Sequence, residues 1–427
     1  MKRIPILFAA LLLASPIHAQ LTLEECCRLA REHYPEIRQY DLIRKSKEYT
    51  LSNANRAYLP QIDFAAQATW QSAVPALPDA LTGILAQQGV DMPGLRKDQY
   101  RVGVDVSQSL WDGGQTRAAK RLAEAEAAEQ ERATDVDLYA VEGRVKELFF
   151  GILSLDEQVR QTGLTQQLLQ SNLDKLRALQ REGVAMPSDG DAVEAELLAA
   201  GQRRLQAEAT AKSFRRMLGI FIGRELDDER LVCPEAEAPA PESPSRRPEL
   251  ALFEASAERI DIEQQRVRAA SRPRFGLFIQ GYYGYPGMDY FESMRSADWS
   301  WNAMAGIRMS WNFGAYYTKR NSLEKLRTSR RQIDIQRDIF LFNTRLKSTE
   351  ESGEIVRLRR ALADDDRIVA LRRAVREAAE AKLRNGVIDT NGLLQTITDE
   401  AAASLNRSAR EIELTKAIYD LKHTLNR

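Results

Sequence analysis

Two stretches of the chain, residues 100–110 and 299–313, alternate between apolar and polar side chains. Weaker versions of the same alternation precede them at residues 61–70 and 274–280. A period of two is the pattern of a β-strand with one apolar and one polar face. The sequence therefore predicts four strands of about ten residues, grouped as two β-hairpins over residues 61–111 and 274–313.

The alternation also predicts which residues share a face of these strands. The apolar face is expected to hold Val102, Val104, Val106, Leu110, Ile307 and Met309, and the polar face Asp105, Ser107 and Arg308. A soluble antiparallel sheet with one hydrated face would show the same pattern. A membrane strand would show it too, because about ten tilted residues span a bilayer.

The aromatic residues favour the membrane interpretation. All five tryptophans lie in or at the ends of the four stretches. Rings at strand ends are typical of the girdles where membrane strands meet lipid headgroups. The predicted girdle consists of Trp70, Tyr100, Trp111, Tyr283, Trp299, Trp301 and Trp311.

Outside the hairpins the pattern is helical. From Val141 to Val159 apolar residues recur at alternating steps of four and three, which is a heptad seam for packing helix along helix. We predict helices over 116–180, 188–222, 318–385 and 391–426, with a further helix before each hairpin. A helix of about 65 residues is about 100 Å long, more than a compact domain needs. Strands and helices together predict an α+β fold.

The chain is internally duplicated. Gly103 and Ser107 match Gly306 and Ser310, 203 positions on, and "REGVAMPSDGDAVEAELLAA" (181–200) matches "RNGVIDTNGLLQTITDEAAA" (384–403) at the same offset. The first repeat is expected over 20–224 and the second over 247–427. Between them, residues 225–246 are expected to form a linker rich in Pro, Glu and Ala, and its stretch 234–245 ("PEAEAPAPESPS") is expected to be extended and without a core.

The N-terminal residues predict export. Lys2 and Arg3 precede an apolar run that ends near Ala19, which is typical of a secretory signal peptide over residues 1–19. Without it the chain has 59 basic and 61 acidic residues, a balance that gives no case for binding nucleic acid. No apolar run of 18 residues follows residue 20, so any membrane span is expected to be a β-strand.

The sequence offers no chemistry of an enzyme. It has no phosphate-binding loop, nucleophile elbow or His-centred triad, and no Cys/His cluster with metal-ligand spacing. We therefore expect no catalytic residues, cofactor or metal. Cys26 and Cys27 are adjacent and poorly placed to bond each other, so they are expected to be small packing residues, with Cys233 near the linker.

Four strands cannot close a barrel, and open strand edges are not tolerated in lipid. Three copies would supply twelve strands, with Gly113 and Gly114 providing the backbone freedom to turn from strand into helix. The alternative is a secreted or periplasmic coiled-coil structural protein. The duplicated amphipathic hairpins and their tryptophans count against that alternative.

Several motifs in duplicated order resemble the TolC-type outer membrane factor family across nearly the whole chain. They are "LTLEECCRLAREHYPEIR", "SQSLWDGGQTRAA", "RPEL" and the turns "QREGVAMPSD" and "LRNGVIDTNG". The resemblance implies a homotrimer in the outer membrane, with a twelve-stranded barrel continuous with a periplasmic tube of helices. It implies a periplasmic adaptor and an inner-membrane transporter as partners, in efflux or in type I protein secretion. The exported substrate stays open.

The resemblance also implies roles for the two helix-to-helix turns. Family turns of this kind accept the tip of the adaptor, a role carried over to Arg181, Gly183, Val184, Arg384, Gly386 and Val387. The alternative is a purely structural turn, in which glycine ends a helix in the left-handed conformation.

Inward carboxylates after the turns close the periplasmic entrance in this family. The candidates here are Asp189, Asp191 and Asp389, although Gly392 and Gln395 stand where the second repeat should carry its carboxylates. The alternative is that acidic residues simply favour a helix N-terminus. The run Asp364–Asp366 is expected to be a solvated or lumen-facing helix surface.

Overall fold

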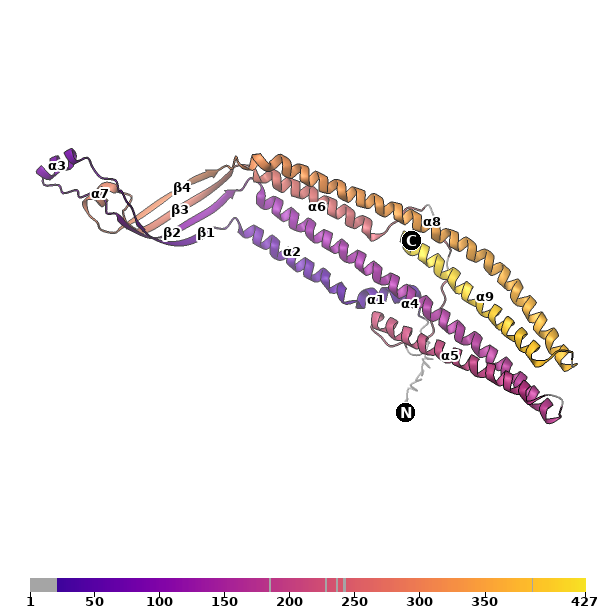
Figure 1. Cartoon of the computed structure of the whole chain (residues 1–427). Coiled ribbons are helices and arrows are strands. Elements are labelled where there is room, and N and C mark those ends of the chain that lie inside the picture. Colours follow the sequence, from indigo (N-terminus) through magenta and orange to yellow (C-terminus); the bar gives the residue numbers. More distant parts are fainter. Residues whose placement is uncertain (1–20, 184–185, 227–228, 236, 241–242, 386) are drawn as a thin grey trace, which may run out of the picture. The chain divides into compact units, whose positions relative to one another are not determined.

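The structure is a computed structural model that describes residues 21–183, 186–226, 229–235, 237–240, 243–385 and 387–427. The expected signal peptide and two of the turn residues, Val184 and Gly386, lie outside the described residues. In the first repeat the elements are α1 (Leu23–His33), η1 (Pro35–Arg38), α2 (Gln39–Arg56), β1 (Gln61–Trp70), α3 (Asp79–Gln87), β2 (Asp98–Trp111), α4 (Gln115–Arg181) and α5 (Pro187–Ile222). In the second they are α6 (Pro248–Ala270), β3 (Arg274–Tyr285), α7 (Tyr290–Arg295), β4 (Ser300–Ser310), α8 (Ala315–Arg384) and α9 (Thr390–Leu425) (Figure 1).

The chain forms two compact units, which do not follow the sequence repeats. Unit 1 comprises the described residues up to Tyr40 together with Arg132–Leu252 and Gln336–Arg427. Unit 2 comprises Asp41–Glu131 and Phe253–Ile335. Each unit therefore combines a part of the first repeat with the matching part of the second.

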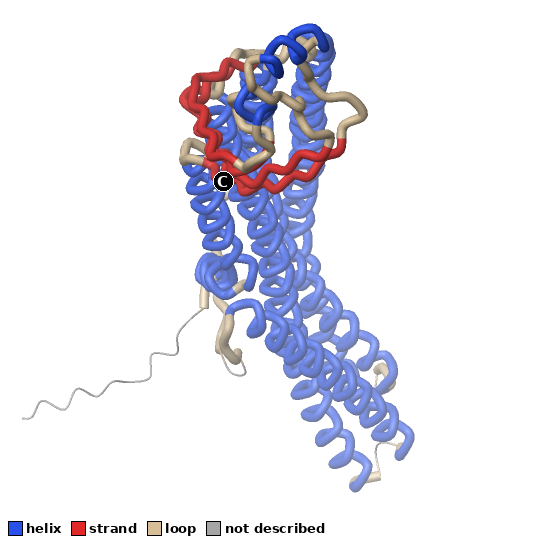
Figure 2. The backbone as a smooth tube through the Cα atoms, turned by 90° about the vertical axis from the view of Figure 1, so that its left-hand side faces the viewer, coloured by secondary structure: helices blue, strands red, loops and turns tan. Residues whose placement is uncertain are grey.

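Unit 2 contains one antiparallel sheet in the order β1-β2-β3-β4, drawn in red in Figure 2. The two predicted hairpins are joined by pairing between β2 and β3, in which Val104 lies opposite Gly281. On the other side Val104 lies opposite Phe64 of β1, and Gly281 lies opposite Ala303 of β4. One row of apolar residues thus crosses all four strands, and β1 and β4 form the two edges.

The paired residues fall on the predicted faces, and the pairing is irregular only at the end of β2. The register shifts between Ser109 and Trp111, so Leu110 is the extra residue of a β-bulge, and Trp111 takes the place opposite Phe275. Leu110 has no partner in this register, so its assignment to the apolar face stays a prediction. β4 also ends at Ser310, three residues before the expected end of the hairpin.

A short turn converts β2 into α4. Gly113 and Gly114 both have positive φ, at 71° and 87°, which glycine adopts without the steric cost of a Cβ. Asp112 then caps the helix, accepting hydrogen bonds from the amides of Gly114 (2.9 Å) and Thr116 (2.6 Å). The glycine pair therefore has the bending role expected from the sequence.

The core of unit 1 is built around α4. Phe149, Phe150 and Ile152 are buried with residues of α1 and α5. Leu226 and Leu231 belong to the same cluster, and Leu231 forms a parallel bridge with Leu21. The first part of the linker is therefore packed into this core, ahead of residues 234–245, for which no core was expected.

The cysteines of unit 1 are free thiols. Cys26 is fully buried in the α1 core, as expected for a packing residue, and Cys27 packs partly against that core. Burial raises the pKa of both thiols to about 12, so neither is a reactive thiolate at neutral pH. Cys233 is exposed.

Helices in the described part of the chain fall short of what a bilayer span requires in apolar length.

Candidate functional site

Aromatic rings gather at both ends of the sheet in unit 2. At the loop end, Trp299 lies 6.1 Å from the ring of Tyr100 and 5.4 Å from that of Tyr283, and Tyr283 lies 5.0 Å from Trp301. Trp70, the last residue of β1, is at the same end of the sheet and is 72% exposed. This half of the predicted girdle is therefore assembled within one chain.

The end of the sheet next to the long helices carries the other rings. Trp111 lies 5.9 Å from Phe275, and Trp311 lies 4.6 Å from Phe313. The indole nitrogen of Trp311 donates to the carbonyl of Ser271 at 3.2 Å. Rings with one apolar body and one hydrogen-bonding tip suit a boundary between lipid and water.

Between the two aromatic ends, the apolar face of the sheet is uncovered by its own chain. Phe64 of β1 is 74% exposed and Ile307 of β4 is 71% exposed. A soluble monomer rarely leaves a contiguous apolar face of this kind in water. The face therefore requires another apolar medium or partner.

The polar face has a different construction, built twice from a glycine, an aromatic ring and an arginine. Tyr282 lies opposite Gly103, and the guanidinium of Arg101 stacks over its ring at 5.3 Å. Phe278 lies opposite Gly306, and Arg308 stacks over that ring at 4.5 Å. These contacts are cation–π interactions.

The glycines make these stacks possible. A Cβ on Gly103 would lie 2.7 Å from the Cβ of Tyr282, and a Cβ on Gly306 would lie 2.9 Å from the ring of Phe278. Only a residue without a side chain lets the ring lie down on the neighbouring strand. The duplicated glycines seen in the sequence thus have a shared packing role, which alternation alone did not reveal.

The same face is suited to water. Asp63 of β1 lies directly opposite Asp105 of β2. Like charges directly opposite each other destabilise a strand pair, and water and salt reduce that repulsion. One face of the sheet is therefore apolar and the other polar and charged.

In unit 1, the two helical hairpins meet near their turns. Leu176 of α4 and Val193 of α5 are buried with Leu393 and Ile397 of α9. A small cavity there is also lined by Arg384, the last residue of α8. Residues next to the two turns therefore pack together within this unit.

The predicted turn residues differ in their surroundings. Gly183 has a φ of 75° and no heavy atom within 4 Å of where its Cβ would be, so the turn is both glycine-dependent and open. Arg181 donates to the carbonyl of Arg177 at 3.3 Å and is otherwise exposed. Val387 is 68% exposed.

Two of the three gate candidates cap helices. The Asp189 carboxylate accepts from the amide of Met186 at 3.0 Å at the start of α5. The Asp389 carboxylate accepts from the amide of Gly392 at 2.8 Å at the start of α9. Asp191 is exposed. The structural alternative from the sequence therefore accounts for Asp189 and Asp389, and a gating role stays a prediction.

The acidic run on α8 is exposed at Asp364 and Asp366, as the sequence had suggested, and differs at its middle residue. Asp365 is buried and its carboxylate lies 2.5 Å from the guanidinium of Arg410 on α9. Asp366 pairs with Arg407 at 3.0 Å. The missed signal is the matching spacing of the two arginines, which places both on one face of α9.

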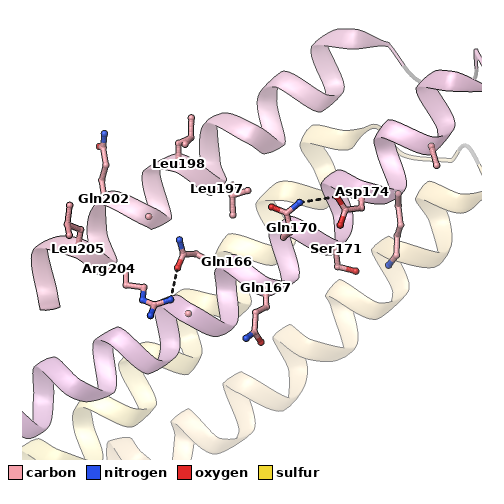
Figure 3. Close-up of a pocket in the computed structure, with 14 residues that line it drawn as sticks. Gln166, Gln167, Gln170, Ser171, Asp174, Leu197, Leu198, Gln202, Arg204 and Leu205 are labelled. Carbon is pink, nitrogen blue, oxygen red and sulfur yellow. Dashed lines mark hydrogen bonds between the residues drawn. The ribbon is translucent and has the colours of Figure 1, made fainter. Parts of the chain in front are cut away.

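A groove runs between α4 and α5 in unit 1 (Figure 3). Its polar side chains include Gln166, which accepts from Arg204 at 3.5 Å, and Gln170, which donates to Asp174 at 2.9 Å. Leu198 and Leu205 line the same groove and are more than 60% exposed. Their spacing of seven residues is that of a helix-packing seam and can be seen in the sequence.

Among the described residues, no three His, Cys, Asp or Glu side chains lie where they could hold a metal ion together.

The chain was compared with known proteins. Residues 27–219 match the family model described as outer membrane efflux protein. A search of the curated proteins found no match.

The fold is that of solved outer membrane channels. The outer membrane protein VceC of Vibrio cholerae aligns with 12% identity and a TM-score of 0.67 over 94% of this chain and 95% of its own. The CmeC outer membrane channel of Campylobacter jejuni gives 13% and 0.64 over 94% and 85%, and the MtrE outer membrane channel of Neisseria gonorrhoeae gives 14% and 0.64 over 94% and 88%.

Proposed function

We propose that the chain is the outer membrane exit duct of a tripartite efflux pump, a role that is supported by the match of residues 27–219 to the family model described as outer membrane efflux protein. In this role it receives substrates from a periplasmic adaptor and an inner-membrane transporter and passes them outside. The observation that carries the proposal is the sheet of unit 2. It has one uncovered apolar face, one charged face, aromatic rings at both ends and two edges.

The two edge strands, β1 and β4, support a trimeric assembly. β1 and β4 run antiparallel to each other in a four-stranded antiparallel sheet, so β4 of one copy can pair with β1 of the next without reversing a strand. Three copies give twelve strands and leave no unpaired edge, which lipid requires. Asp105, Ser107 and Arg308 then line the lumen, and Val104 and Ile307 face lipid.

The helices extend the duct into the periplasm. α4 has 67 residues and α8 has 70, about 100 Å of helix each. In the trimer, the exposed seam with Leu198 and Leu205 packs against helices of a neighbouring copy. Arg181, Gly183, Arg384 and Val387 form the adaptor contact around the turns.

The first experiment measures the assembly. Protein extracted from outer membranes in mild detergent is expected to have the mass of a trimer, with no stable folded monomer, since a monomer exposes two strand edges. A folded monomer with its full β signal in circular dichroism would contradict the duct. Recovery in the soluble periplasmic or secreted fraction would support the coiled-coil structural protein instead.

The second experiment tests the entrance. Gly183→Trp is expected to abolish export of a pump substrate while trimer level and membrane location stay unchanged. Gly89→Trp is the matched control, because Gly89 also has a positive φ and open space around it but lies in the β1–β2 loop of unit 2. The corresponding Gly386→Trp variant is expected to behave like Gly183→Trp.

Crosslinking adds orientation to that test. A photoreactive residue at position 184 or 387 is expected to capture the adaptor. Capture from the 72–99 loop would show that this loop is periplasmic and that the proposed orientation is inverted.

A further inference from the structure

The loops that join the strands carry apolar residues which their own chain leaves uncovered. No residue of α3 is buried, and Leu81 and Ile84 on this helix are 49% and 55% exposed. In the other loop, Phe291 of α7 is 67% exposed, and Tyr290 is exposed beside it. Single exposed apolar residues are normal, but a group on one helix marks an interaction surface.

A small buried cluster joins the two loops close to these exposed residues in the sequence. Leu95 of the β1–β2 loop and Met294 of α7 are buried against Tyr285 at the end of β3. The Tyr285 hydroxyl accepts from the amide of Arg96 at 2.9 Å and donates to the carbonyl of Ser293 at 3.1 Å. The two loops are thus joined within one chain by this cluster, and the exposed rings and aliphatic side chains are not part of it.

The topology indicates what covers them. α3 follows the edge strand β1, and α7 precedes the other edge strand β4 (Figure 1). The last residue of β1 and the first of β4 are at the same end of the sheet, because each is next to a hairpin loop. When β1 of one copy pairs with β4 of the next, the loop leaving β1 and the loop entering β4 become neighbours.

We propose that α3 of each copy packs Leu81 and Ile84 against Phe291 and Tyr290 of the next copy, so that the loops form a ring of three identical contacts. The proposal rests on the trimer proposed above and adds an interface beyond the strands. Each contact is heterologous, and three of them close the ring.

A lipid surface is the other candidate occupant, and the composition of α3 speaks against it. Helices that lie in a membrane interface carry Lys or Arg on their polar face. α3 has the sequence DALTGILAQ, with no basic residue and one acidic residue. A second copy of the chain, with aromatic rings to offer, fits this helix better.

Mixed copies test the contact directly. One tagged chain carries Ile84→Cys and a differently tagged chain carries Phe291→Cys, both with the exposed Cys233 replaced by Ser. Co-expression and mild oxidation are expected to give a disulfide-linked heterodimer. The control replaces Ile84→Cys by Ala86→Cys, which is also exposed but lies 200° around the helix, as two residues of 100° each; it is expected to give little product.

The outcomes separate this proposal from the duct itself. A trimer by mass with no heterodimer, or with equal product from positions 84 and 86, overturns the loop contact and leaves the duct standing. A monomer by mass overturns the duct. An intrachain disulfide when both cysteines are in one chain, with no interchain product, also overturns the contact.

A second variant pair gives an independent readout. Ile84→Asp is expected to lower the temperature at which the extracted trimer dissociates, and Ala86→Asp is expected to leave that temperature near the wild-type value. Equal dissociation temperatures for the two variants would overturn the proposal even if both proteins fold normally.

Discussion

Replacing Val104 by arginine tests which face of the sheet meets lipid. Val104 is in the middle of β2, and its neighbours on the adjacent strands are Phe64 and Gly281. An arginine at mid-membrane on the lipid face costs about 2–4 kcal/mol, so three copies cost about 6–12 kcal/mol per trimer. Because 1.4 kcal/mol is a factor of ten, even one copy shifts the folding equilibrium about 30- to 700-fold.

The assay is the amount of trimer in the outer membrane fraction, read as the band that shifts on heating. Val104→Arg is expected to reduce that band strongly. Ser107→Arg is the control, because Ser107 lies three residues away on the polar face, opposite Gln61 and Phe278. Equal trimer levels for the two variants would refute the register, and a greater loss from Ser107→Arg would reverse the two faces.

Three further variants probe the packing. Burial, together with nearby cations, lowers the pKa of His423 to about 4, whereas the pKa of an unfolded histidine is near 6.5. Between these pH values the unfolded state binds more protons than the folded state. The free energy of unfolding should therefore fall by up to about 3 kcal/mol as the pH drops through that window. His423→Gln should flatten this part of the melting temperature–pH curve, and an unchanged slope would exclude the imidazole as its source. Gly306→Leu should lower the melting temperature of the trimer by displacing the ring of Phe278, and adding Phe278→Ala should restore part of it; simple additivity would argue against that contact. Asp365→Ala should lower the free energy of unfolding in urea by about 3 kcal/mol, because it leaves Arg410 partly buried and unpaired. Adding Arg410→Ala should recover part of that loss. A loss below about 0.5 kcal/mol for Asp365→Ala would mean that water screens the pair.

The regular elements could be predicted closely because their signals are local. α4 was expected over 116–180 and occupies Gln115–Arg181, and β1 was expected over 61–70 and occupies those residues. Alternation also gave the faces, since a strand places every second side chain on the same side. The internal duplication supported the predicted elements and their faces, because each type of element occurs in both repeats.

The departures come where tertiary contacts decide. Leu110 continues the apolar alternation in the sequence, but a bulge removes it from the register. Leu226 and Leu231, at the start of the linker, are buried with residues of α1 and α4, a contact that the Pro/Glu/Ala composition did not indicate. α3 was not predicted, because it has only nine residues and none of them is buried.

The gate shows how far a family resemblance can be carried onto single side chains. At the start of α5 and of α9 an aspartate accepts a hydrogen bond from a backbone amide of the first turn or just before it. A helix start needs such an acceptor whether or not a channel closes there, because its first amides have no partner within the helix. Asp389 therefore has a structural reason to be present, as the cap of α9. A carboxylate that only caps should tolerate exchange to asparagine, which accepts the same bond without a charge, whereas a carboxylate that closes the entrance by charge should not.

Asp189→Asn and Asp389→Asn are thus expected to keep stability near wild type, and conductance of the trimer in a planar bilayer then reports any gating role separately. An unchanged conductance would assign both residues to capping alone.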